Sequence, residues 1–62
     1  MRPKELIKIL EAKGWKHERT SGSHQIMTKP GKRSIPIPFH GNKDFDPKFI
    51  RMIEKQTGEK II

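Results

Sequence analysis

Histidines are the residues of this chain best suited to acid–base chemistry, and His24 stands in the most suggestive place. Imidazole gains and loses a proton near neutral pH, so one side chain can accept or donate a proton in a reaction. His24 directly follows Gly22 and Ser23, a turn-forming pair. A histidine in such a position is either catalytic or an ordinary residue at the start of a strand, and spacing alone leaves both readings open.

The other titratable residues offer less. His17 lies among charged residues, where we expect it to be solvated, and His40 could assist His24, bind phosphate or cap a turn. The sequence has no Cys, and Asp44 and Asp46 lack a third carboxylate or a nearby histidine. Asp46 is in addition explained as a helix N-cap. We therefore expect no metal and no other cofactor.

The charge balance predicts a polyanionic partner. Lys and Arg number 14 against 7 Asp and Glu, a formal net charge of +7 in only 62 residues. Uninterrupted apolar stretches do not exceed two residues, so we expect neither a membrane segment nor a secretory signal. Nucleic acid is the expected partner and the cytoplasm the expected location.

Two helices are predicted, one near each end. Residues 3–13 carry apolar residues at helical spacing and end at Gly14, after which Trp15 should pack back on Leu10 in a Schellman cap. Residues 47–57 form the second, with Asp46 as its N-cap, Pro47 in the first helical position and Gly58 as its stop. A hydrophobic staple should join Phe45 to Ile50. The expected buried stripe of this helix is Ile50 and Ile53 with Phe49 or Met52.

Three strands are predicted between the helices, at residues 15–20, 24–28 and 34–39. The Ser21-Gly22-Ser23 loop joins the first two, and a type II turn at Pro30-Gly31 leads into the third. The third strand alternates apolar residues with prolines. Because prolines lack an N–H, this strand should lie at a sheet edge with the missing donors facing outward.

The predicted fold is α+β: a helix-strand-strand-strand-helix, two-layer sandwich over a single domain, residues 1–62. Both helices should cover the one apolar face of a three-stranded antiparallel sheet. The double-stranded RNA-binding domain has the same order of elements, which is an analogy of fold and carries no function by itself.

Several motifs together resemble the HicA toxin family over nearly the whole chain. They are Gly22-Ser23-His24, Pro30 six residues on, the run from Ile35 to His40, and the helix end Gln56-Thr57-Gly58. The lysine-rich first helix closed by Gly14-Trp15 fits as well. One departure is Asp46-Pro47, where relatives often have glycine-threonine at the start of the second helix. It is itself a suitable cap, so the expected fold is unaffected.

The resemblance implies an activity, a site and a partner. It implies a type II toxin with a double-stranded RNA-binding-domain-like fold, which acts as an endoribonuclease (mRNA interferase) on mRNA. It also implies a HicB-type antitoxin that binds the toxin. It assigns the catalytic role to His24. RNA carries its own nucleophile, the 2′-hydroxyl, so one histidine with cations nearby can support slow cleavage.

The expected RNA contacts surround this histidine. They are Lys16, Arg19, Gly22, Ser23, Lys29, Lys32 and Arg33, with His40 as a possible assistant. An alternative reading is a non-catalytic RNA-binding module that uses the same basic surface. A DNA-binding regulator is a third and weaker reading, because the second helix offers few residues that could contact DNA bases.

Overall fold

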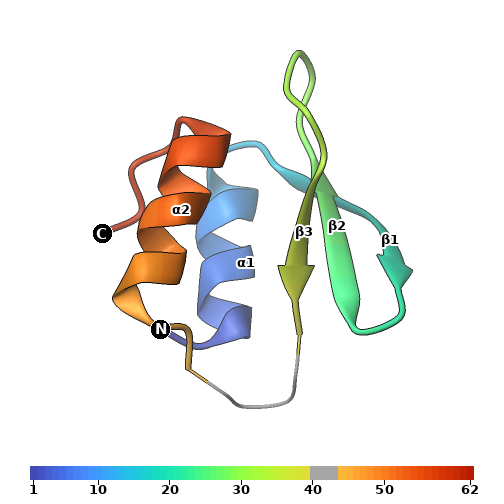
Figure 1. Cartoon of the computed structure of the whole chain (residues 1–62). Helices are drawn as coiled ribbons and strands as arrows, with labels where there is room; N and C mark the ends of the chain where they lie inside the picture. The colour runs from blue at the N-terminus through green and yellow to red at the C-terminus, as the bar shows by residue number, and fades with distance from the viewer. Residues whose placement is uncertain (40–43) are drawn as a thin grey trace.

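A computed structural model describes residues 1–39 and 44–62 and confirms the predicted α+β fold (Figure 1). The elements are α1 (Pro3–Ala12), β1 (Lys16–Ser21), β2 (His24–Thr28), β3 (Ile35–Pro38) and α2 (Pro47–Thr57). The three strands form one antiparallel sheet in the order β1-β2-β3, so His24 begins the central strand. Both helices lie on the same side of the sheet (Figure 1).

The C-terminal cap of α1 is the predicted Schellman motif. The Trp15 N–H donates to the Leu10 carbonyl at 3.0 Å and the Gly14 N–H donates to the Glu11 carbonyl at 3.1 Å. Gly14 has φ of 98°, a conformation that a side chain would disfavour. The cap turns the chain so that Trp15 enters the core, where it is 1% exposed.

Helix α2 also begins and ends as predicted. The Asp46 carboxylate accepts a hydrogen bond from the Lys48 N–H at 2.8 Å, and the Gly58 N–H donates to the Glu54 carbonyl at 2.8 Å. Before the cap, the Phe45 ring packs on Phe49 with centroids 4.5 Å apart. The ring contact of Phe45 is thus with Phe49, one residue before Ile50, the predicted staple partner.

A single apolar cluster holds the helices to the sheet. The second helix contributes Ile50 and Ile53, both buried, with Phe49 packed against them, while Met52 is 43% exposed. Phe49 therefore completes the stripe and Met52 does not. The buried residues of the cluster are Leu6, Leu10, Trp15, Met27, Ile35, Ile37, Ile50 and Ile53.

Strand β3 is a sheet edge, as its prolines predicted. Just past its end, the Phe39 N–H donates to the Ser23 carbonyl at 2.7 Å. Hydrogen-bonded and non-hydrogen-bonded pairs alternate along an antiparallel ladder. The pairs that contain Pro36 and Pro38 are consequently of the second kind, with the positions of the missing N–H groups turned away from β2.

No helix among the described residues is long and apolar enough to span a membrane.

Candidate functional site

His24 lies on the face of the sheet that the helices leave uncovered. Side chains alternate between faces along a strand, and Met27 of β2 belongs to the core. His24 is therefore on the opposite face, where it is half-buried between its cross-strand partners Ser21 of β1 and Pro38 of β3. The imidazole thus sits on a face of the sheet that neither helix covers, which a long polymer can approach.

The turn before His24 is well defined. Gly22 and Ser23 connect a closing pair formed by Ser21 and His24, and only Gly22 has a positive φ, 59°. This is the pattern of a type II′ hairpin, which matches the twist of the strands. The Ser23 carbonyl is also fixed by Phe39, from the other neighbouring strand. Gly22 and Ser23, both predicted to contact RNA, therefore lie directly beside the candidate catalytic residue.

A β-bulge decides which side chains of β1 share this face. The pairing shifts between His17, which faces Met27, and Arg19, which faces Ile26, so that Glu18 is an extra residue. The extra residue reverses the alternation of side chains, so from Arg19 onward the odd-numbered residues occupy the face that Lys16 occupies before the bulge. Arg19 and Ser21 consequently share the face of His24.

Lys16 also belongs to this uncovered face, because it pairs with Thr28. It lies near the far end of β2, whereas Arg19 is only two residues from the partner of His24. The Arg19 guanidinium forms an ion pair with the Glu18 carboxylate, and the two side chains are 63% and 48% exposed. Such an exposed pair is weak, about 0–1 kcal/mol, so a phosphate can compete for Arg19.

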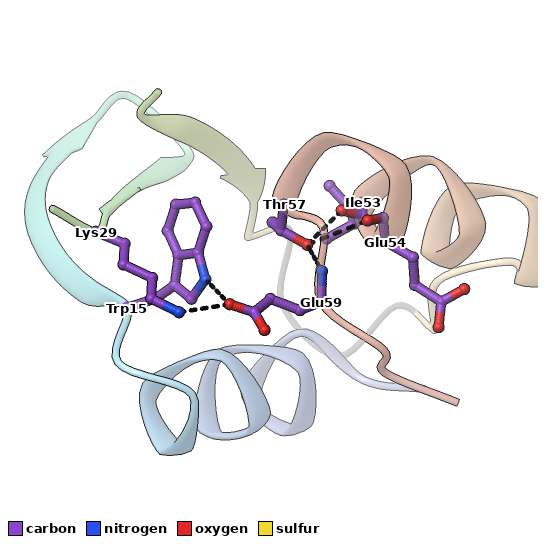
Figure 2. A network of polar contacts seen from close by, with 6 residues as sticks. All are labelled: Trp15, Lys29, Ile53, Glu54, Thr57 and Glu59. Atoms are coloured by element: carbon purple, nitrogen blue, oxygen red, sulfur yellow. Dashed lines mark hydrogen bonds and ion pairs between the residues drawn. The ribbon is translucent and has the colours of Figure 1, made fainter. Parts of the chain in front are cut away.

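Lys29 has a structural partner. Its ammonium group donates to a Glu59 carboxylate oxygen at 2.7 Å, and the Trp15 Nε1–H donates to the same oxygen at 3.1 Å (Figure 2). The side chains of Lys29 and Glu59 are only 29% and 18% exposed. We therefore leave Lys29 out of the proposed RNA surface.

Thr57 holds Glu59 in place within the same network (Figure 2). Its hydroxyl donates to the Ile53 carbonyl at 2.8 Å and accepts from the Glu59 N–H at 3.1 Å. Thr57 is 1% exposed, which makes this a buried anchor for the segment after α2. The network thus joins the segments that directly follow α1 and β2 to the end of α2 and the chain after it.

The remaining predicted cations lie at the other end of the sheet. Lys32 and Arg33 follow the turn closed by the Lys32 N–H and the Lys29 carbonyl at 3.0 Å. His24 and Thr28 are separated by the length of β2, about 13 Å at 3.3 Å per residue. The loop therefore cannot contact a phosphate bound beside His24, and only a longer polymer segment would reach both places.

His40 lies outside the described residues, so its predicted role stays a prediction. His17 is exposed, and its Nε2 is 3.0 Å from the Thr20 hydroxyl oxygen. It faces Met27 across the strands and is thus on the side opposite His24. Among residues 1–39 and 44–62 there is no cluster of three potential metal ligands.

The two glutamates near the C-terminus have lowered pKa values. Hydrogen bonds from Lys29 and from the Trp15 indole lower the pKa of Glu59. The N–H groups of Ile61 and Ile62, which donate to Glu54 at 2.8 and 3.1 Å, lower the pKa of Glu54. A carboxyl group with a lowered pKa in the folded state stabilises that state while it is ionised.

We expect this stabilisation to be complete above about pH 4.3, the ordinary pKa of glutamate, and to be lost as the pH falls through the lowered values. Urea unfolding measured at pH 7 and at successively lower pH should show the loss. In Glu59→Gln the pH dependence should be shallower, whereas the exposed Glu11→Gln should behave as wild type. Equal slopes for Glu59→Gln and wild type would contradict the assignment.

Comparison with known proteins identifies one family. A family model described as "HicA toxin of bacterial toxin-antitoxin" matches residues 3–59, which include every helix and strand of the fold. A search of curated proteins found no match.

Proposed function

The chain belongs to the HicA toxin family of bacterial toxin-antitoxin systems, and from this membership we propose that it is an endoribonuclease that cleaves mRNA with His24 as its acid–base residue. The observation that carries the proposal is the position of His24. It stands on the uncovered face of the sheet, beside the two-residue turn of the hairpin and on the same face as Arg19. A toxin that acts on a polymer needs such an open, cationic surface.

The proposed chemistry starts from the RNA itself. The 2′-hydroxyl attacks the neighbouring phosphorus, the P–O5′ bond breaks, and the products are a 2′,3′-cyclic phosphate and a 5′-hydroxyl. The reaction needs a group that accepts the 2′-hydroxyl proton and one that donates a proton to O5′. His24 performs proton transfer, and the cationic side chains stabilise the charge on the phosphate oxygens.

Binding is proposed to use two zones of the same surface. Near the histidine, Arg19 and the backbone N–H groups of the Gly22-Ser23 turn contact the phosphate that is cut. Farther along, Lys16 and the loop with Lys32 and Arg33 contact phosphates of the same strand. Phosphate contacts fix the register of the RNA and carry no sequence information.

A HicB-type antitoxin is the proposed partner. Among the described residues, the face that carries His24 also carries the cations Lys16 and Arg19 and is covered by neither helix, so an acidic partner can cover it and exclude RNA. Co-expression with the antitoxin should then protect His24 and Arg19 from solvent in hydrogen-exchange or labelling experiments.

We expect the purified protein to bind single-stranded RNA and DNA of one sequence, but to cut only the RNA, because DNA lacks the attacking hydroxyl. The sharpest substrate is an RNA with one 2′-deoxy nucleotide at the cleaved position, which should be bound and left intact. Gel analysis of end-labelled substrates in EDTA measures both properties. Cleavage of the deoxy substrate, or loss of RNA cleavage in EDTA, would contradict the mechanism. RNA that is bound but stays intact over hours would favour a non-catalytic binding module.

A further inference from the structure

We propose that Glu18 is the second catalytic residue, the general base that accepts the 2′-hydroxyl proton, while His24 donates a proton to the leaving O5′. This inference rests on the proposed ribonuclease function and assigns the group that the mechanism above leaves unnamed. Glu18 is the extra residue of the β-bulge, and neither the fold nor the core requires a carboxylate there.

The first support is the side to which Glu18 points. Adjacent residues of a regular strand point to opposite faces of a sheet. Glu18 and Arg19 are adjacent, yet their side chains form an ion pair. The bulge has therefore brought both onto one side, and Arg19 is on the side of His24 because it faces Ile26.

The second support is the spacing. Two residues along β1 separate Arg19 from Ser21, about 7 Å, and a hydrogen-bonded pair such as Ser21 and His24 has Cα atoms about 5.5 Å apart. The Cα atoms of Arg19 and His24 are then roughly 9 Å apart on the diagonal. Strand side chains stand roughly perpendicular to the sheet, so this separation leaves space for one phosphodiester between the carboxylate paired with Arg19 and the imidazole.

The third support is the set of charged groups that face this space. Helices cover only the other side of the sheet, and β3 contributes Pro36 and Pro38 to this side. Among the described residues of the three strands, the titratable groups on this face are Lys16, Glu18, Arg19 and His24. Glu18 is thus the only carboxylate among these groups.

The roles follow from the charges. A carboxylate paired with a guanidinium is a proton acceptor only, so Glu18 takes the 2′-hydroxyl proton. The 2′-oxygen forms its bond to phosphorus as the P–O5′ bond breaks. The imidazolium of His24 gives its proton to O5′, and exchange with water restores both residues. Arg19 bridges the carboxylate and the phosphate and offsets their repulsion.

The test is Glu18→Gln, which keeps size and removes the base. We expect kcat to fall by about 10²-fold or more, while RNA affinity stays the same or rises, because Arg19 loses a competitor. The matched control is Glu11→Gln, the same change on the exposed surface of α1, which should cleave as wild type. Rates that stay unchanged or rise in Glu18→Gln would overturn the assignment.

Two further readouts separate a base from a structural residue. The pH profile of kcat/KM should rise as the base loses its proton and fall as the acid loses its own, and Glu18→Gln should lack the rising limb. An RNA whose leaving O5′ is replaced by sulfur needs no proton donor. It should restore cleavage to His24→Ala and not to Glu18→Gln, and the reverse result would overturn the roles.

The two proposals fail in different ways. If wild type cuts RNA, His24→Ala does not, and Glu18→Gln cuts as fast as wild type, only the assignment of Glu18 is wrong. If wild type leaves RNA intact under all conditions, the proposed ribonuclease function fails and the assignment of Glu18 fails with it.

Discussion

His24→Ala should abolish RNA cleavage while leaving the protein folded and able to bind RNA. We expect kcat to fall by about 10²–10⁴-fold, the usual contribution of one positioned acid–base group. Affinity should change little, since the phosphate contacts are assigned to Arg19, Lys16 and the turn. Single-turnover cleavage and binding titrations of the same RNA measure the two effects separately.

His17→Ala is the matched control for this experiment. His17 belongs to the same hairpin and is also an imidazole, yet it faces Met27 and so lies on the opposite side of the strands from His24. Its hydrogen bond with Thr20 is exposed, so its loss should not unfold the domain. If His17→Ala lost cleavage, or His24→Ala kept it, the position of the site on the uncovered face would be wrong.

The same pair of variants predicts the effect in cells. Induced expression of wild type should arrest growth, and expression of His24→Ala at the same protein level should not. His17→Ala should remain toxic. Growth arrest by His24→Ala would mean that RNA or antitoxin binding alone is harmful, and the alternative of a non-catalytic binding module would then be favoured.

Features set by nearby residues were predictable from the sequence. The cap at Gly14-Trp15, the Asp46 N-cap and the Pro30-Gly31 turn each depend on residues within one turn of chain, and each is present. The edge position of β3 followed from the missing donors of its prolines. These local features were enough to place His24 at the start of the central strand.

Features set by distant residues were not predictable. Lys29 appeared as one more surface cation, because its partner Glu59 lies 30 residues away and nothing local marks the pair. The bulge at Glu18 has no sequence signal either, yet it determines which side of the sheet Arg19 occupies. A period-two reading of β1 from Lys16 therefore places Arg19 and Ser21 on the wrong face.

The same bulge shows how a short chain can gain a charged group without changing its pairing. Strand β1 pairs with β2 both before and after Glu18, so the extra residue adds a carboxylate while Ser21 remains opposite His24. All of β1 is exposed, and a bulge in such a strand costs no core packing.

Trp15 is the largest of the fully buried side chains in the core. Trp15 is the only tryptophan, it is 1% exposed within the cluster that joins both helices to the sheet, and its indole N–H donates to Glu59. Trp15→Ala should cost about 3–5 kcal/mol through the lost contacts and the cavity left behind. A domain of this length has a total stability of only about 3–9 kcal/mol.

We therefore expect Trp15→Ala to be largely unfolded or to melt near room temperature, as measured by far-ultraviolet circular dichroism during urea and thermal unfolding. Trp15→Phe loses the N–H but keeps most of the apolar volume. Its loss of stability should therefore be less than half that of Trp15→Ala. A Trp15→Ala protein as stable as wild type would show that Trp15 does not carry the core. Because the uncovered sheet face contains no part of this cluster, Trp15→Phe should retain full cleavage at temperatures where it is folded.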